Sequence, residues 1–304
     1  MPPRPRDDGL SEVVGFVLLL GVIVIALSLY QVYGVPAVGR ENEIAHMNQV
    51  KDRFVDYKIA LDSLWVNNMD YNRTGVLLST AFDLGTGAPA TAGTVFALPI
   101  LTPAGSGGTV SVQSGGAKLT IEPAGKDPVP IPLGSLTYRS SNHYWVDQTW
   151  IYQGGAVFLS QEGGTAVRVG PSISVYNNAG KASVYITPVN ITGSAYLAGS
   201  GPVRIETRLR DMKDYAGLTG NFSWVNISID AGDVGYARAW ERAFREAARR
   251  ERIDSPWYDV GGGTSNVAYL NITGPSTDET RDVSLRTIRA DYLVSVISAA
   301  SLIE

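Results

Sequence analysis

VVGFVLLLGVIVIALSLYQVY, residues 13–33, is the most apolar part of the chain, with 21 residues and no charged side chain. At about 1.5 Å per residue, a helix of this length spans the roughly 30 Å hydrocarbon core of a lipid bilayer. Tyr30 and Tyr33 near its end belong to a residue type that is enriched at membrane interfaces. We therefore predict a transmembrane helix over residues 10–33, and not the buried core helix of a soluble protein.

The residues on either side of this span carry few basic side chains. Arg4 and Arg6 precede it together with the α-amino group, whereas Arg40 is the first basic residue after it. Basic residues stay preferentially on the cytoplasmic side of a membrane. We therefore expect a single-pass protein of the cell membrane, with its N-terminus inside the cell and the rest of the chain outside.

A small residue, Gly9, lies directly before the apolar run and is followed by Leu10, Ser11 and Glu12. A secretory signal would instead end a shorter apolar run in a small-residue cleavage motif. The arrangement resembles the class III leader of archaeal type IV pilin-like proteins, in which a membrane aspartic peptidase, the prepilin peptidase, cuts after a glycine on the cytoplasmic side. The resemblance implies a leader of residues 1–9, cleavage between Gly9 and Leu10, and a mature helix that packs with identical chains or other pilins in a filament.

Ser11 and Glu12 also fit a purely local interpretation. An oxygen-bearing cap and an acidic residue near the positive end of the dipole are typical of a helix start. Many bacterial pilins carry a glutamate at the fifth mature position, whereas Glu12 would be the third. Its carboxylate could still neutralise the new α-amino group of Leu10 or that of a neighbouring chain, so the two interpretations are compatible.

Residues 34–68 predict a second, amphipathic helix that forms a stalk. Its apolar positions recur at spacings of three and four, which is the pattern of one helix face: Met47, Val50, Phe54, Tyr57, Leu61 and Leu64. This stripe is short for a coiled coil, so we expect it to pack on the chain's own downstream domain. His46 lies among polar neighbours, and we expect it to be solvated.

The remainder, residues 69–304, reads as an extracellular β-rich head. Short alternating runs are separated by turns rich in Gly and Pro, and the chain holds 33 Gly and 16 Pro in all. HYWVDQTWIYQGGAVFLSQ, residues 143–161, predicts a hairpin about Gly154 and Gly155. It also resembles a YxGGAVxxxQ core of uncharacterised archaeal pilin-like surface proteins, through Tyr152, Gly154, Gly155, Ala156, Val157 and Gln161. That resemblance implies a surface protein and no particular activity.

One helix is expected within the head, in the segment of residues 232–253, where Tyr236, Trp240, Phe244 and Ala247 form one apolar stripe at helical spacing. Asp233 is a suitable N-cap, and Glu241 with Arg245 and Glu246 with Arg250 can pair at a spacing of four. Its six arginines allow an anion-binding face, but a solvated outer face of a helix that covers a sheet is the simpler interpretation. The last segment is predicted to be a strand from Val283 until about Ser298.

Five Asn-x-Ser/Thr sequons occur, at Asn72, Asn190, Asn221, Asn226 and Asn271. An occupied sequon needs an outward-facing asparagine in a surface segment. Two interpretations stay open: a glycoprotein, or a strand composition that is simply rich in Asn, Ser and Thr.

Few residues are available for catalysis. The chain has no cysteine and only two histidines, which excludes thiol chemistry, thiolate zinc sites and multi-histidine metal centres. Outside the stalk, His143 is the one candidate base, and no GxSxG motif accompanies it. Gly261, Gly262 and Gly263 lack the lysine of a phosphate-binding loop and predict a turn. Five aspartates could offer oxygen ligands to calcium, but no spaced calcium loop contains them: Asp211, Asp214, Asp230, Asp233 and Asp259.

These observations predict an α+β fold, in which an N-terminal transmembrane and stalk helix precedes a sandwich-like, antiparallel β-rich head with one covering helix. The expected function is that of a pilin-like structural or adhesive surface protein, in the membrane or in an extracellular filament. We expect no enzyme, cofactor or metal site, and the net charge of −4 favours no nucleic-acid partner. The alternative is an uncleaved membrane protein that binds a glycan or an envelope partner through exposed aromatics, with Tyr144, Trp145, Trp150 and Tyr152 as candidates.

Overall fold

The computed structural model describes residues 8–68, 75–87, 101–251, 253, 255–275 and 281–298, and from Asp8 to Val66 the chain forms one uninterrupted helix. The helix consists of α1 (Asp8–Leu29), the π-helical turn η1 (Tyr30–Gly34) and α2 (Val35–Val66). The expected boundary at residues 33 and 34 therefore lies inside a helical turn, not in a break. Pro36 explains the wider turn, because its ring would crowd the carbonyl of Val32 one α-helical turn earlier.

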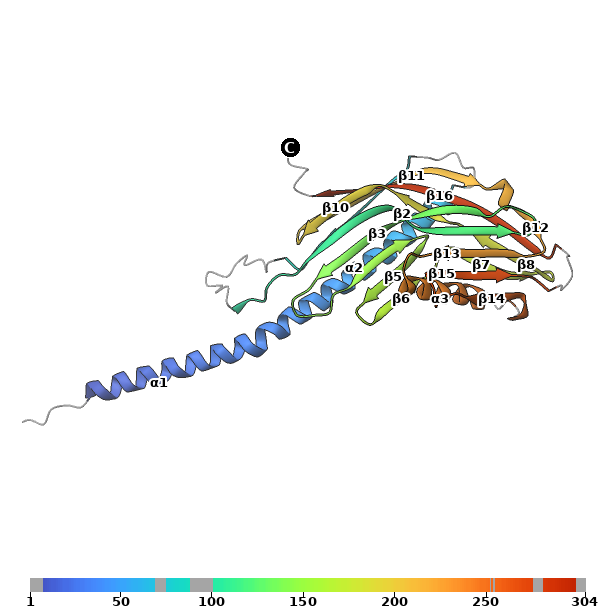
Figure 1. Ribbon diagram of the computed structural model, residues 1–304. Coiled ribbons are helices and arrows are strands. Elements are labelled where there is room, and N and C mark those ends of the chain that lie inside the picture. The colour runs from blue at the N-terminus through green and yellow to red at the C-terminus, as the bar shows by residue number, and fades with distance from the viewer. Residues whose placement is uncertain are drawn as a thin grey trace, which may run out of the picture.

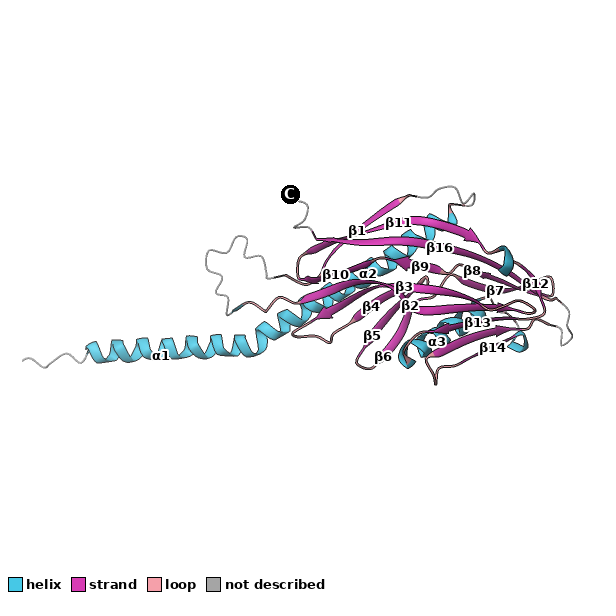
Figure 2. Cartoon of the chain, turned by 45° about the horizontal axis from the view of Figure 1, so that its top comes forward, coloured by secondary structure: helices cyan, strands magenta, loops and turns pink. Residues whose placement is uncertain are grey.

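Two β-sheets form the head (Figures 1 and 2). The seven-stranded sheet has the order β1-β11-β16-β8-β7, and β9 and β12 also pair with β16. Its strands are β1 (Leu77–Asp83), β7 (Ile173–Asn178), β8 (Lys181–Ile186), β9 (Val189–Thr192), β11 (Pro202–Asp214), β12 (Gly220–Phe222) and β16 (Val283–Ser298). The pairings of β16 with β8 and β9 are parallel, and the other pairings in the sheet are antiparallel.

The nine-stranded sheet is antiparallel and has the order β14-β15-β13-β2-β3-β4-β5-β6, with β10 beside β2. Its strands are β2 (Gly107–Pro123), β3 (Val129–Ser141), β4 (Thr149–Gln153), β5 (Ala156–Gln161), β6 (Gly164–Val169), β10 (Ser194–Gly199), β13 (Val225–Asp230), β14 (Tyr258–Gly261) and β15 (Val267–Ile272). The described part of the head also contains the 3-10 turns η3 (Ala216–Leu218) and η4 (Ser255–Trp257) and the helix α3 (Val234–Arg250). The α+β fold with an antiparallel, β-rich head is thus confirmed.

The head has two hydrophobic clusters, and each contains one helix. The apolar stripe of α2 packs against strands of both sheets, and the first five of its six members, Met47, Val50, Phe54, Tyr57 and Leu61, are all buried. The stripe therefore packs on the chain's own head, as expected. Two hydrogen bonds reinforce the contact, from the Tyr292 hydroxyl to the carbonyl of Leu61 at 2.8 Å and between the Tyr57 and Thr207 hydroxyls at 2.8 Å.

The second cluster surrounds α3, which buries Trp240, Phe244 and its alanines against the sheets. Asp233 caps the helix as predicted, because its Oδ1 accepts the N–H groups of Gly235 and Tyr236 at 2.7 and 3.2 Å. The Glu241–Arg245 pair also forms. The expected pairing of Glu246 with Arg250 is wrong, since Arg250 donates to the carbonyl of Ile173 instead.

Other local predictions are also confirmed. β4 and β5 form a hairpin about Gly154 and Gly155, whose φ angles of 59° and 82° are the left-handed values that a two-residue turn requires. The predicted strand from Val283 is present as β16, which extends to Ser298, the last residue that the structure describes. The glycine run after α3 forms the turn between β14 and β15, where Ser265 N–H donates to the Gly262 carbonyl.

Candidate functional site

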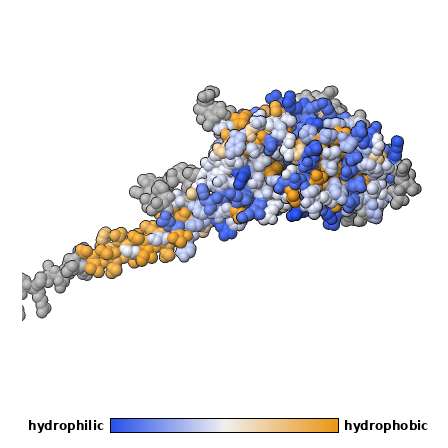
Figure 3. Space-filling model, in the orientation of Figure 1, coloured by the Kyte–Doolittle hydropathy of each residue, from blue (hydrophilic) through white to orange (hydrophobic). Residues whose placement is uncertain are grey.

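The surface of α1 is the most unusual feature of the molecule (Figure 3). Every large apolar side chain from Val13 to Leu29 is between 40% and 66% exposed, so none of them belongs to the core of the head. A helix that is apolar on all sides is normally buried in a protein core or a membrane. Helix Glu12–Val66 is, by length and composition, able to cross a membrane, and its most apolar window has no buried residue.

Two glycines interrupt this apolar surface. A Cβ atom added at Gly15 or Gly21 would meet nothing within 4 Å, so the fold of a single chain gives no reason for glycine at either position. Small residues let two membrane helices approach closely. The pair therefore fits a helix that packs against other helices.

Glu43 joins the stalk helix to the head. This glutamate of α2 is 1% exposed, and its carboxylate accepts three consecutive backbone N–H groups from the loop between β3 and β4. The donors are His143 to Oε1 at 2.7 Å, and Tyr144 and Trp145 to Oε2 at 2.8 and 2.7 Å. Hydrogen bonds to a charged acceptor are about twice as strong as neutral ones, so this contact fixes the start of α2 on the head.

Two further contacts hold the same loop against α2. A Cβ atom at Gly39 would overlap the ring of Tyr144, so only glycine fits there. The Arg40 guanidinium lies 4.5 Å from the centre of the Trp145 ring, a cation–π distance. Glu43, Gly39 and Arg40 together set the direction in which α1 leaves the head.

His46 is buried, and the expectation that it is solvated is wrong. Its Nε2 lies 3.2 Å from the hydroxyl of Tyr138, which donates to the carbonyl of Leu84 at 2.7 Å. The hydroxyl proton is thereby committed, so the Nε2–H donates to the Tyr138 oxygen. Burial lowers the pKa of His46, although the Leu84 carbonyl and the charge of Asp83 act in the opposite direction. No local pattern around His46 indicates its burial, because Tyr138 and Leu84 are distant in the chain.

We predict that His46 makes the head less stable in acid. The unfolded chain binds a proton on this imidazole near its ordinary pKa of 6.5, and the folded protein only at lower pH. The folded state therefore loses stability as the pH falls below that value. Melting temperatures at about pH 7.5 and about pH 5.5 should differ more for wild type than for His46→Gln. The exposed His143→Gln variant is the control and should follow wild type; an equal acid shift in His46→Gln would contradict the prediction.

The proposed leader residues lie at the start of α1. Residues 1–7 are outside the described residues, whereas Gly9, Leu10 and Ser11 are part of the helix, which begins at Asp8. Glu12 is exposed.

The sequons differ in their surroundings. Asn72 lies outside the described residues, and the prediction at Asn190 does not fit the folded protein: Asn190 is 4% exposed, accepts the Gly134 N–H and donates to Asp291. Asn221 is exposed. Asn226 and Asn271 are half-buried and directly opposite each other on β13 and β15. Their neighbours in sequence are buried, so both asparagines lie on the outer face of the sheet.

The aromatic candidates do not form an exposed surface. Trp150 and Tyr152 are 2% and 0% exposed and belong to the cluster around α2, so their predicted role in binding is wrong. Tyr144 and Trp145 are half-buried against Gly39 and Arg40 of α2. The alternation of side chains along β4 could not have revealed that Trp150 and Tyr152 are buried, because α2 covers this strand.

The candidates for chemistry are dispersed. The imidazole of His143 is on an exposed residue beside Tyr144. The five aspartates have local partners: Lys213 for Asp211, Thr219 for Asp214, the Gly232 N–H for Asp230, the helix start for Asp233 and Tyr269 for Asp259. Within the described part of the chain, no group of three or more His, Asp or Glu side chains could hold a metal ion.

A protein-family model matches most of the chain. The sequence model of a family described as a family of unknown function, DUF7289, matches residues 9–289. No curated protein and no solved structure matches the chain. The match begins at Gly9 and includes the apolar helix together with almost the whole head.

Proposed function

The chain belongs to DUF7289, a family of unknown function, and we propose that it is a pilin-like cell-surface protein, anchored by α1, with its β-rich head outside the cell. After cleavage behind Gly9, the mature helix would be able to leave the bilayer and enter a type IV pilus-like filament. In this proposal the partners are the membrane, the prepilin peptidase, and further copies of the chain or other pilins.

The exposed apolar surface of α1 is the observation that carries the proposal. Thirteen Val, Leu, Ile and Phe side chains lie between Val13 and Leu29, and water is a poor solvent for all of them. A bilayer would cover this surface, and so would the corresponding helices of neighbouring copies. Gly15 and Gly21 favour contact with the helices of neighbouring copies, because both glycines allow two helices to approach closely and neither is needed in the fold of the single chain.

The junction between stalk and head supports a structural role. A subunit that transmits force along a filament needs a head that cannot swing freely about its helix. Glu43 fixes the loop at residues 143–145 to α2, and the stripe of α2 is buried in the head. The helix and the head therefore form one continuous unit.

The head would remain outside the cell under this proposal. Arg4 and Arg6 before the apolar span favour an N-terminus in the cytoplasm. Asn221, Asn226 and Asn271, the sequons with outward-facing side chains, would then be accessible for glycosylation.

We predict that Gly9→Val abolishes cleavage of the leader. The peptidase of the proposed class requires a small residue at this position. The variant should therefore keep its original N-terminus and be heavier than processed wild type by the mass of residues 1–9. Gly15→Val makes the same change inside the apolar span and should still be processed. Intact-mass and N-terminal analysis of protein from native membranes measures both.

A wild-type N-terminus at Met1 or Pro2 would contradict cleavage. The remaining interpretation would then be the alternative, a single-pass membrane protein that does not assemble and that acts by binding. A mature N-terminus at Leu10 on cells that carry no filaments of this protein would indicate a membrane protein that is processed but does not assemble.

A further inference from the structure

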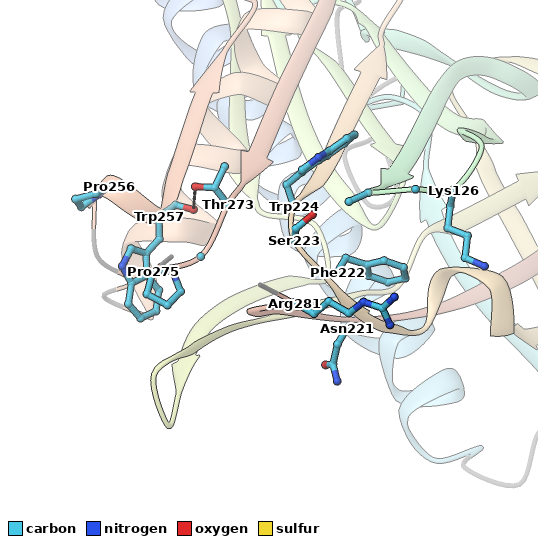
Figure 4. Close-up of a pocket in the computed structure, with 13 residues that line it drawn as sticks. Lys126, Asn221, Phe222, Ser223, Trp224, Pro256, Trp257, Thr273, Pro275 and Arg281 are labelled. Atoms are coloured by element: carbon cyan, nitrogen blue, oxygen red, sulfur yellow. Dashed lines mark hydrogen bonds between the residues drawn. The ribbon is translucent and has the colours of Figure 1, made fainter. Parts of the chain in front are cut away.

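The sequon at Asn271 lies where a strand of the nine-stranded sheet ends. Asn271 is the penultimate residue of β15, and Thr273, the third residue of the sequon, follows the strand and is exposed. Thr273 borders the cavity in Figure 4, which Trp224 and Trp257 also line. Its N–H donates to the carbonyl of Trp257 at 2.9 Å. The backbone of this sequon is therefore held in place, while its hydroxyl residue remains accessible.

The sequon at Asn226 has different surroundings. Its asparagine also faces outward, but residues 226–228 all belong to β13, which pairs with β2 on one side and with β15 on the other. The third residue, Ser228, is half-buried in the middle of the sheet. A sequon that is modified lies in a surface segment that the enzyme reaches. The folded head therefore presents the sequon of Asn271 better than that of Asn226.

A fixed tyrosine lies beside Asn271 on the outer face of the sheet. Tyr269 precedes Asn271 by two residues on β15, so the two side chains leave the strand on the same side. Its ring lies over Gly261 of β14, because a Cβ atom there would come within 3.2 Å of the Tyr269 Oη, Cζ and Cε1 atoms. The Tyr269 hydroxyl donates to Oδ2 of Asp259 at 3.1 Å, which fixes the ring in this position.

The position of this ring suits a sugar that is attached to Asn271. A tyrosine offers a flat apolar surface with a polar end, and Tyr269 is half-buried, with the sheet under one side of its ring. Residues two apart on a strand are separated by about 6.6 Å, so the first sugars of a glycan reach the ring. Asp259 lies directly opposite Asn271, and its Oδ1 can accept a sugar hydroxyl.

We propose that Asn271 carries an N-linked glycan whose first sugars pack on Tyr269, and that Asn226 stays unmodified. In the transfer, Nδ2 of Asn271 bonds to the anomeric carbon of an oligosaccharide, and the phosphate of the lipid-linked donor leaves with the amide proton. The inference rests on the proposed function, because only a head outside the cell meets such an enzyme.

Mass spectrometry of the full chain from native membranes measures which asparagines are modified. Glycopeptides, fragmented to locate the sugar, should show a glycan on Asn271 and none on Asn226. A membrane-impermeant amine reagent, applied to the same cells while they are intact, reports on which side of the membrane the head lies. The two measurements together separate a failure of this inference from a failure of the proposed function.

A double-mutant cycle tests the packing on Tyr269. In protein from native membranes, Asn271→Gln removes the glycan and should lower the melting temperature by about 2–4 °C. In the Tyr269→Ala background the same change should have no effect, because the glycan has already lost its contact. Tyr196→Ala removes a 74% exposed tyrosine of β10, and this matched control should keep the full loss.

A second control shows that the glycan, and not the amide side chain, causes the loss. Wild type and Asn271→Gln from a host without N-glycosylation should melt at the same temperature, since neither of them carries a sugar. A loss of the same size in that host would overturn the assigned role of the glycan.

Three further results would overturn the inference. One is an unmodified Asn271, or a modified Asn226, on a head that the amine reagent finds outside the cell. Another is an unchanged melting temperature when the glycan on Asn271 is removed. The third is an equal loss in the wild-type and Tyr269→Ala backgrounds. All three leave the proposed function intact, whereas an unmodified head inside the cell overturns both.

Discussion

A chain that begins at Val35, without residues 1–34, is expected to move from the membrane fraction to the soluble fraction and to keep its melting temperature. Each Val, Leu, Ile or Phe contributes roughly −0.3 to −0.6 kcal/mol to membrane insertion. Thirteen such residues are lost between Val13 and Leu29, which amounts to about 5 kcal/mol. Partitioning into the membrane should therefore fall by more than about a thousandfold.

The melting temperature should stay the same because α1 does not pack on the head. Its large side chains are exposed, and the buried part of the long helix lies in α2, which the truncated chain retains. Cell fractionation and thermal melting of the purified head measure the two effects. A chain that lacks only residues 2–7 keeps α1 and is the control for the membrane fraction. Membrane association of the shorter chain, or a clearly lower melting temperature, would contradict this assignment of α1.

Glu43→Gln is expected to destabilise the protein by about 3 kcal/mol, because one charged acceptor serves three backbone donors and is itself buried. The amide keeps one acceptor oxygen and replaces the other with a donor, so N–H groups of the loop lose their partner. A loss of this size lowers the melting temperature of a domain by roughly 5–10 °C. Hydrogen exchange should also become faster at residues 143–145, which locates the effect at the junction.

Glu41→Gln is the matched control, two residues earlier on the same helix. Glu41 is exposed, and the loss of an exposed charge changes stability by less than about 0.5 kcal/mol. Its melting temperature and its exchange at residues 143–145 should equal those of wild type. If both variants melt alike, Glu43 is not the residue that fixes the loop.

Features that depend on neighbours in the chain could be predicted from the sequence. The apolar span has its own signature in length and composition, and the seam of α2 follows from spacings of three and four. Asp233 caps α3 through N–H groups two and three residues ahead, and the hairpin at Gly154 and Gly155 depends on two residues that tolerate positive φ. In each case the physical cause lies within a few residues of the feature.

Features that depend on long-range contacts could not be predicted. Glu43 and His46 look like solvated polar residues of a helix, and only the packing of α2 on the head brings the loop at 143–145 and Tyr138 to them. Asn190 satisfies a sequon, but the pairing of β9 with β16 places it beside Asp291. Trp224 and Trp257 come from different segments, and the pairing of β13, β14 and β15 brings them to one cavity.

Labelling of an introduced cysteine on intact cells tests most directly whether the head lies outside the cell, as the proposed function requires. The chain has no cysteine, so Ser200→Cys in the exposed turn between β10 and β11 provides the only thiol. A membrane-impermeant maleimide should label this variant on intact cells as fully as on permeabilised cells, while the cysteine-free wild type stays unlabelled. Labelling that appears only after permeabilisation would place the head inside the cell and contradict the proposed function.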